Sequence, residues 1–342
     1  MTQDFTVEPL LSAALASPIL DPRASDPVFT ASVEEMKAAI TCPDISSSSS
    51  SSSNPAEGGT VLLVPGTATT GSECFKDTPY VQLLPHQGRG YKVCWVDLPD
   101  HTLGDVQVAA EYVAFAIEHL SQQRRREQGS SAAKINVIGH SQGGLVVQWA
   151  LNFWETKREL VEKFIGLAAN FQGSLLSDLL CNSLEGVLGC PPAAYQQGKD
   201  SNLIKALNRH GGDQALVDTA AIYTYTDEAL VYPGSASLPG ATNLALQDAK
   251  ICGKDHFVLH NTITTDAGAF RMVLDILENG SKKSIPEGPM STEECSSFSD
   301  MIPEQSFKSV DLVDMLSDKI KENLRLLVGW VDHEPPLMPY AQ

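Results

Sequence analysis

The chain has 342 residues, of which 42% are hydrophobic, so it is long enough to fold as one large domain with a sizeable core. Its 24 basic and 42 acidic side chains give a formal net charge of −18, which argues against nucleic acid and anionic membrane surfaces as partners. No apolar run is long enough to span a membrane.

The first residues carry no recognisable targeting signal. Residues 1–24 predict a flexible leader, in which Asp4 and Glu8 stand where a secretory signal has Lys or Arg. The apolar stretch from Leu10 to Leu20 is also broken by Ser and Pro. Residues 46–56 begin with an unbroken serine run and predict a second flexible segment, a serine-rich loop.

The next segment alternates between strand and helix patterns. Apolar, β-branched runs predict strands over 60–65 and 91–97, and helical spacing follows from Val106 to Gln123. The first strand ends in Pro65–Gly71, a turn rich in Thr that offers both backbone and side-chain hydrogen-bond donors.

Residues 134–153 form the most informative stretch of the chain. An apolar strand over 134–140 meets Gly139-His140-Ser141-Gln142-Gly143, and a helical pattern runs from Leu145 to Phe153. Gly-x-Ser-x-Gly between a strand and a helix is typical of a sharp turn that exposes a nucleophilic serine. We therefore take Ser141 as the candidate nucleophile of an α/β hydrolase.

A serine that attacks a carbonyl group needs donors for the oxyanion that forms. One donor in such sites is the backbone N–H after the nucleophile, here that of Gln142, and the other comes from a loop after an early strand. Thr67, in the turn after the first strand, is our candidate for the second donor.

The serine also needs a base and an orienting acid, which follow it along the chain in this fold. A strand pattern over 221–226 ends in Asp227-Glu228, and Asp227 is favoured because it comes first and has the shorter side chain. The next strand, 243–251, is followed by His256 and His260, between which spacing alone does not decide.

Two further segments complete the prediction. After a strand over 163–169, residues 171–200 are apolar, marked by Gly and Pro, and predict a cap or lid. Helical spacing recurs over 263–278 and 310–328. The alternation predicts an α/β hydrolase with a mostly parallel central sheet, helices on both faces and a small helical cap, as a single domain over 25–342.

Five stretches resemble the fungal lipase B family, of the Candida antarctica lipase B type. The likeness runs in order from about residue 25 to the end. The matching stretches are Ser25–Phe29, Leu62–Gly71, Ser141–Trp149, Tyr223–Glu228 and Leu337–Ala341.

The resemblance implies a secreted serine hydrolase that acts on carboxylic esters, with Ser141, Asp227, Thr67 and Gln142 in the roles above. In this family the histidine lies a fixed distance beyond a Cys-Gly pair, and the count from Cys252-Gly253 gives His260.

The chain departs from the family at three positions. His140 stands where the best-known members have Trp, Asn170 where Asp is usual, and Leu259 where Asp is expected. We assign His140 and Asn170 to the substrate pocket, and we expect these changes to affect substrate preference and not the triad.

The seven cysteines favour an oxidising compartment and therefore secretion, although no signal peptide is visible. The family comparison implies two pairs, the spacing suggests a third, and Cys74 is left over. The pairs are Cys42 with Cys94, Cys252 with Cys295, and Cys181 with Cys190.

The leading hypothesis is a lipase or esterase, a carboxylic ester hydrolase that works as a monomer on an ester or lipid substrate, in solution or at a lipid–water interface. We expect no cofactor and no metal, because the chain has no Cys-x-x-Cys or histidine cluster. The alternative is a non-catalytic lipid-binding protein on the same scaffold.

Overall fold

The computed structural model describes residues 26–43, 57–128, 133–175, 177–178, 181, 189–230, 233–283, 289–301, 307–309 and 329–342. Four predictions fall outside this part of the chain, entirely or in part. They are the leader 1–24, the serine-rich loop 46–56, the helix 310–328 and the middle of the cap segment 171–200.

The described residues contain a seven-stranded sheet in the order β1-β3-β2-β4-β5-β6-β7. Only β1 runs antiparallel to its neighbour, so the sheet is mostly parallel, as the β-α alternation predicted. Its strands are β1 Ile40–Thr41, β2 Thr60–Val64, β3 Lys92–Val96, β4 Ile135–His140, β5 Val161–Leu167, β6 Thr219–Tyr223 and β7 Thr242–Ala245.

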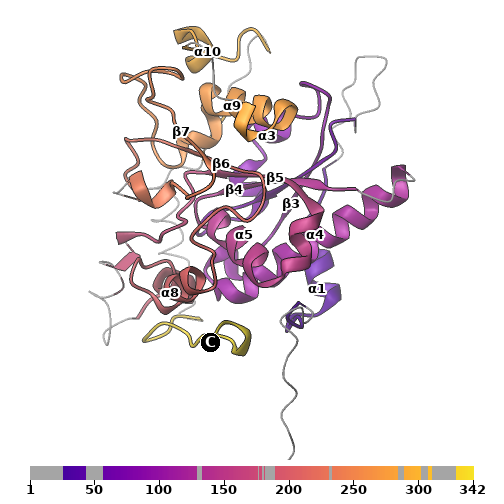
Figure 1. The fold of residues 1–342 in the computed structure, drawn as a ribbon, viewed down its shortest axis with the longest axis vertical. Coiled ribbons are helices and arrows are strands. Elements are labelled where there is room, and N and C mark those ends of the chain that lie inside the picture. The colour runs from indigo at the N-terminus through magenta and orange to yellow at the C-terminus, as the bar shows by residue number, and fades with distance from the viewer. Residues whose placement is uncertain are drawn as a thin grey trace, which may run out of the picture.

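Side chains of the strands alternate between two apolar cores because successive residues of a strand face opposite sides of a sheet. Leu62 and Val64 of β2 pack with helices α4, α5, α7 and α8, whereas Val61 and Leu63 pack with α2, α3 and α9. Figure 1 shows α9 and α3 on one side of the sheet and α4, α5 and α8 on the other.

The helices have the following bounds: α1 Val33–Ala38, α2 Gly71–Phe75, α3 Pro79–Gln82, α4 Val106–Gln128, α5 Gln142–Phe153, α7 Pro192–Gln196, α8 Asn202–Arg209, α9 Ala267–Asn279 and α10 Thr292–Ser296. None of the helices in the described ranges is both long and apolar enough to cross a membrane.

Several predicted boundaries differ from the structure by a few residues, and two of them differ for clear local reasons. The strand predicted over 243–251 ends at Ala245, because the carbonyl of Asp248 accepts the N–H groups of Ile251 and Gly253 and turns the chain. The helix predicted over 263–278 is divided at Asp266, whose carboxylate accepts the N–H of Ala269 and starts α9 there.

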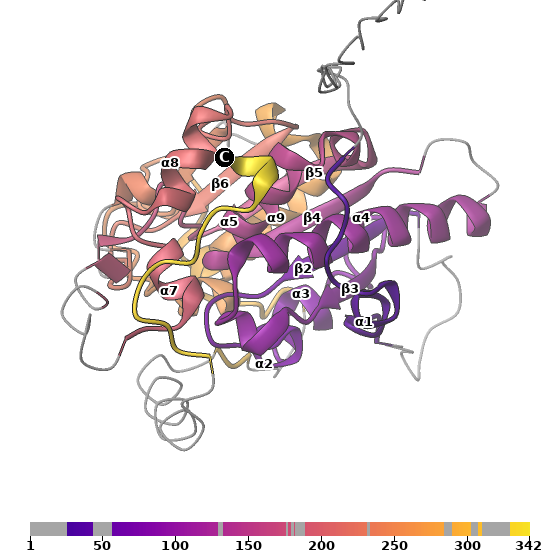
Figure 2. The ribbon, with the colours of Figure 1, turned by 90° about the horizontal axis from the view of Figure 1, so that it is seen from below.

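The C-terminal segment 329–342 packs across several elements of one face. Glu334 accepts the N–H groups of Asn202 and Leu203 at the start of α8, and Met338 donates its N–H to Gln107 of α4. Ala341 then enters the core beside α5. Figure 2 shows this segment in yellow, running past α7 toward α8 and α5.

The predicted cap segment 171–200 is described only in part. Ser174 and Gly198 form an isolated parallel bridge, so the two ends of the segment lie side by side. Pro191 is the N-cap of the short helix α7, Pro192 is its first residue, and Cys181 is bonded to Cys190.

Three disulfides join the pairs expected from the sequence, and Cys74 is a buried free thiol. The strand β1 pairs with β3 through only two residues, Ile40 and Thr41. The disulfide between Cys42 and Cys94 adds a covalent bond that holds β1 against β3.

Removing the disulfide between Cys42 and Cys94 should destabilise the fold more than removing the one between Cys181 and Cys190. The first closes 52 residues of sequence and the second only 9. Loop-closure entropy predicts losses of about 4 and about 2.5 kcal/mol in the free energy of unfolding. Urea unfolding of the two double-alanine variants measures both, and equal losses would contradict the prediction.

Candidate active site

Ser141 stands at the junction between β4 and α5, in a strained backbone conformation. Its φ is 52° and its ψ is −126°, a combination that costs about 1–3 kcal/mol for a residue with a side chain. A Cβ atom on Gly143 would lie 2.3 Å from the carbonyl oxygen of Val64, so only glycine allows α5 to start this close to β2. The Gly-x-Ser-x-Gly pattern therefore forms the predicted sharp turn.

His260 lies between the serine and a carboxylate. Its Nε2 is 2.8 Å from the hydroxyl oxygen of Ser141, and its Nδ1 is 2.8 Å from a carboxylate oxygen of Asp227. All three side chains are buried or nearly so. The structure thus brings together the three residues that the sequence analysis selected from separate parts of the chain.

Asp227 is held as a carboxylate by several donors. Burial alone would raise the pKa of Asp227, but hydrogen bonding and charge from His260, with the N–H groups of Leu230 and Ala229, outweigh burial and lower it below its ordinary value. The second oxygen accepts from Ala229 at 3.0 Å and from Leu230 at 2.7 Å. The side chain is therefore fixed on both oxygens while it faces His260.

The candidate oxyanion residues belong to a network of amides. The hydroxyl of Thr67 donates to Oε1 of Gln142 at 2.8 Å, and Nε2 of Gln142 donates to the carbonyl of Thr102 at 2.8 Å. As the first residue of α5, Gln142 has a backbone N–H without a partner inside the helix. Thr67 and Gln142 are thus in contact with each other, and Gln142 directly follows Ser141 in the chain.

Gln197 is a member of this network that the sequence analysis missed. It donates to Oε1 of Gln142 at 3.0 Å and accepts from the amide of Asn170 at 2.8 Å. An Asp at position 170 would place a carboxylate oxygen against the side-chain oxygen of Gln197, and two acceptors do not form a hydrogen bond. The Asn170 amide, which donates, therefore suits the observed orientation of the Gln197 amide. In the sequence, Gln197 is marked only by the Gln196-Gln197 pair a few residues after two prolines, and this pattern is not typical of any catalytic or binding site.

His140, the residue before the serine, is buried, and both of its ring nitrogens contact the protein. Nε2 is 3.2 Å from the carbonyl oxygen of His260, and Nδ1 is 3.6 Å from the sulfur of Cys74. Burial, together with the charge of His260, lowers the pKa of His140 to about 3, so the ring is neutral at ordinary pH.

The sequence matches the alpha/beta hydrolase family over residues 61–274. It is also 30% identical to lipase B of Pseudozyma antarctica, over 97% of this chain and 92% of that protein. The chain belongs to the lipase B family of α/β hydrolases. Its structure is similar to the crystal structure of Aspergillus fumigatus lipase B, with a TM-score of 0.69, 27% identity, and coverage of 95% of this chain and 76% of that one.

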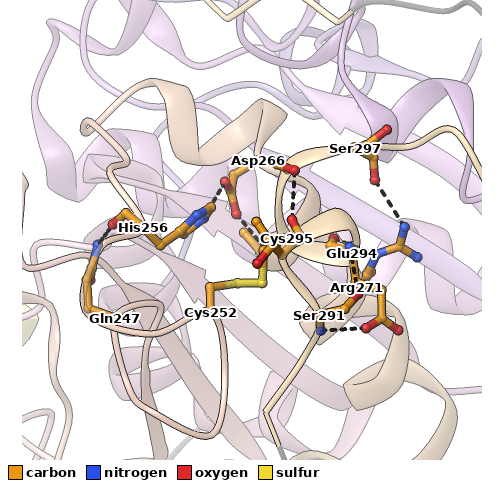
Figure 3. Close-up of a disulfide and its surroundings, with 12 residues drawn as sticks. Gln247, Cys252, His256, Asp266, Arg271, Ser291, Glu294, Cys295 and Ser297 are labelled. Carbon is orange, nitrogen blue, oxygen red and sulfur yellow. Dashed lines mark hydrogen bonds and ion pairs between the residues drawn. A yellow bond between two sulfur atoms is a disulfide. The ribbon is translucent and has the colours of Figure 1, made fainter.

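The other candidate histidine of this hydrolase, His256, lies away from the serine. Its Nε2 is 2.8 Å from a carboxylate oxygen of Asp266, the N-cap of α9. Figure 3 shows this pair beside the disulfide between Cys252 and Cys295. His256 therefore fastens the loop before His260 to the start of α9.

Stability should depend on pH through this pair. The hydrogen bond that His256 donates to Asp266 raises the pKa of His256 against the opposing effect of burial, and the negative charge of Asp266 adds to the increase. The pair therefore stabilises the folded protein in full below about pH 6.5, the pKa of histidine in the unfolded chain. This stabilisation is lost as the pH rises through the higher pKa of His256 in the folded protein. Replacing His256 with Phe should therefore cost more unfolding free energy at pH 5.5 than at pH 9, as measured by urea unfolding. An equal cost at both pH values would contradict this assignment.

Proposed function

We propose that the protein hydrolyses carboxylic esters through Ser141, His260 and Asp227, with a covalent acyl-enzyme intermediate. The observation that carries the proposal is the continuous hydrogen-bonded row from the Ser141 hydroxyl through His260 to Asp227, with 2.8 Å at each step. The names of its relatives, lipase B in both cases, point to the same reaction class.

In the proposed mechanism, His260 takes the hydroxyl proton as Ser141 oxygen attacks the ester carbonyl. Asp227 stabilises the imidazolium that forms and keeps the ring in the tautomer that accepts at Nε2. The imidazolium then gives its proton to the leaving alcohol, and the acyl group stays on Ser141. Water, deprotonated by His260, attacks the acyl-enzyme and releases the acid; an alcohol in place of water would give acyl transfer.

The oxyanion of each tetrahedral intermediate is proposed to rest on donors from Thr67 and Gln142. The proposed donors are the side-chain hydroxyl of Thr67, in the turn after β2, and the backbone N–H of Gln142, at the first position of α5, so both come from segments that directly follow strands of the sheet. Donors that are already oriented stabilise the charge without rearranging during the reaction.

Replacing Thr67 with Val should lower kcat about 100-fold, because one oxyanion donor is typically worth this much. The matched control is Thr219→Val at the opposite end of the sheet, where the hydroxyl donates to the carbonyl of Val217. Steady-state kinetics on a soluble p-nitrophenyl ester measure both variants. A Thr67→Val enzyme as active as the control would show that the Thr67 hydroxyl is not an oxyanion donor.

A fluorophosphonate probe tests the proposal as a whole. The wild-type protein should be labelled on the tryptic peptide that contains Ser141 and should lose its ester hydrolysis in parallel. Labelling no faster than that of Ser141→Ala would overturn the proposal. Activity on p-nitrophenyl esters of rising chain length then separates the two subclasses, since activity that persists on long chains indicates a lipase and activity confined to short chains an esterase.

The same proposal places the enzyme outside the reducing cytosol. Three disulfides join six of the seven cysteines, and such bonds persist in oxidising compartments. All five candidate residues of the site come from one chain, so we propose that the monomer is active on a neutral ester, presented either in solution or at a lipid–water interface.

A further inference from the structure

His260 is supported differently from the other two members of the proposed triad. Ser141 follows β4 directly and Asp227 follows β6 within a few residues. His260 comes at the end of a long connection after β7, which ends at Ala245. Residues 246–259 form turns and no helix or strand, so the position of this imidazole depends on contacts other than its own local backbone.

The peptide groups of His260 are bound from both sides. Its N–H donates to a carboxylate oxygen of Glu228 at 2.9 Å, and its carbonyl oxygen is 3.2 Å from Nε2 of His140. Glu228 follows Asp227 in sequence, and His140 precedes Ser141. The residues next to the acid and next to the nucleophile therefore hold the backbone of the base.

The direction of the hydrogen bond from His140 follows from its surroundings. A carbonyl oxygen can only accept, so the proton of the neutral ring lies on Nε2, which donates to the His260 carbonyl, while Nδ1 faces the sulfur of Cys74, a weak donor, at 3.6 Å. The backbone of His140 is itself fixed, since it pairs with Leu167 as the last residue of β4. The ring centroids of the two histidines are 5.3 Å apart, so His140 also contacts the imidazole it supports.

We propose that His140 is a positioning residue, which transmits the rigid geometry of the sheet to His260 by donating a hydrogen bond to its carbonyl, opposite the acceptor Glu228. This inference rests on the proposed roles of Ser141 and His260. Its physical basis is that proton transfer requires close alignment of the two groups, and a misplacement of about 1 Å can cost roughly 100-fold in rate.

The first test compares His140→Phe with His140→Gln. Phe keeps an aromatic ring but cannot donate, whereas the amide of Gln can donate at a similar reach. We expect Phe to lower kcat on a soluble ester by roughly 30- to 100-fold with little change in KM. Gln should recover most of this loss. If His140 only filled space, Gln would not recover the activity that Phe loses.

The second test uses the opposite side of the same peptide. Glu228→Gln keeps an acceptor for the N–H of His260, and Glu228→Leu removes it. We expect Leu and not Gln to lower kcat. Because both changes act on one peptide group, the loss in the double variant His140→Phe, Glu228→Leu should differ from the product of the single losses.

A control separates positioning from general destabilisation. Ile117 is fully buried in α4, and Ile117→Ala should lower the melting temperature without lowering kcat. The proposal is overturned if His140→Phe retains wild-type kcat, or if His140→Gln is as slow as His140→Phe at equal melting temperature. Absence of fluorophosphonate labelling in the wild type would instead overturn the proposed function, so the two failures are distinguishable.

Discussion

Replacing Ser141 with Ala should lower kcat for ester hydrolysis by roughly 10⁵- to 10⁶-fold. The hydroxyl oxygen is the proposed nucleophile, and without it no acyl-enzyme can form, so any remaining rate comes from oxyanion stabilisation and substrate binding. The loss of one small hydroxyl group leaves the packing nearly unchanged. The melting temperature should therefore stay close to that of the wild type or rise, because the substitution removes no contact on which the fold depends.

The matched control is Ser121→Ala, which removes another buried serine hydroxyl, one that donates to the carbonyl of Ala133 behind α4. This variant should lose some stability and keep its kcat. Both variants are measured by p-nitrophenyl ester hydrolysis in purified protein, with a fluorophosphonate titration of active sites to exclude wild-type contamination. If Ser141→Ala keeps more than about one hundredth of the wild-type kcat, the nucleophile has been misassigned.

Replacing Asp227 with Asn should lower kcat by about 10⁴-fold while the structure stays intact. An amide facing Nδ1 of His260 favours the wrong tautomer, in which Nε2 carries the proton and cannot accept one from Ser141. It also cannot stabilise the imidazolium that forms during attack. Because the pKa of Asp227 lies below its ordinary value, the wild-type carboxylate is charged throughout the neutral range and this loss should be nearly independent of pH there.

The control for this variant is Asp213→Asn, which makes the same chemical change at an exposed aspartate. It should leave kcat unchanged. If the kcat of the Asp227→Asn enzyme lies within tenfold of the wild-type kcat, another group orients His260. Glu228, one residue later, would be the first position to examine.

Local sequence determined the turn that carries the proposed nucleophile, Ser141. The apolar strand, the Gly-x-Ser-x-Gly turn and the helix that follows are adjacent in sequence, so the pattern carries almost all the information about the turn around Ser141. Asp227 was predictable for a similar reason, because it directly follows a strand pattern. The ends of predicted strands and helices were less accurate, since caps such as Asp266 act through single hydrogen bonds that periodicity does not report.

The choice between His256 and His260 shows the limit of residue patterns. The two histidines lie in the same connection, and spacing alone favoured neither; the family resemblance selected His260. In the structure His260 contacts Ser141, whereas His256 binds Asp266. The path of an irregular connection depends on what it packs against, which no periodic pattern encodes.

The sequence by itself determined the fold class and the serine turn and supplied the candidates for the acid and the oxyanion donors, because each of these depends on residues that are close together in the chain. Only the tertiary structure revealed the contacts of His140, Gln197 and Glu228, which join separate loops through single side-chain hydrogen bonds. Such bonds form once the sheet has set the loops side by side, and that arrangement arises from the packing of the whole domain.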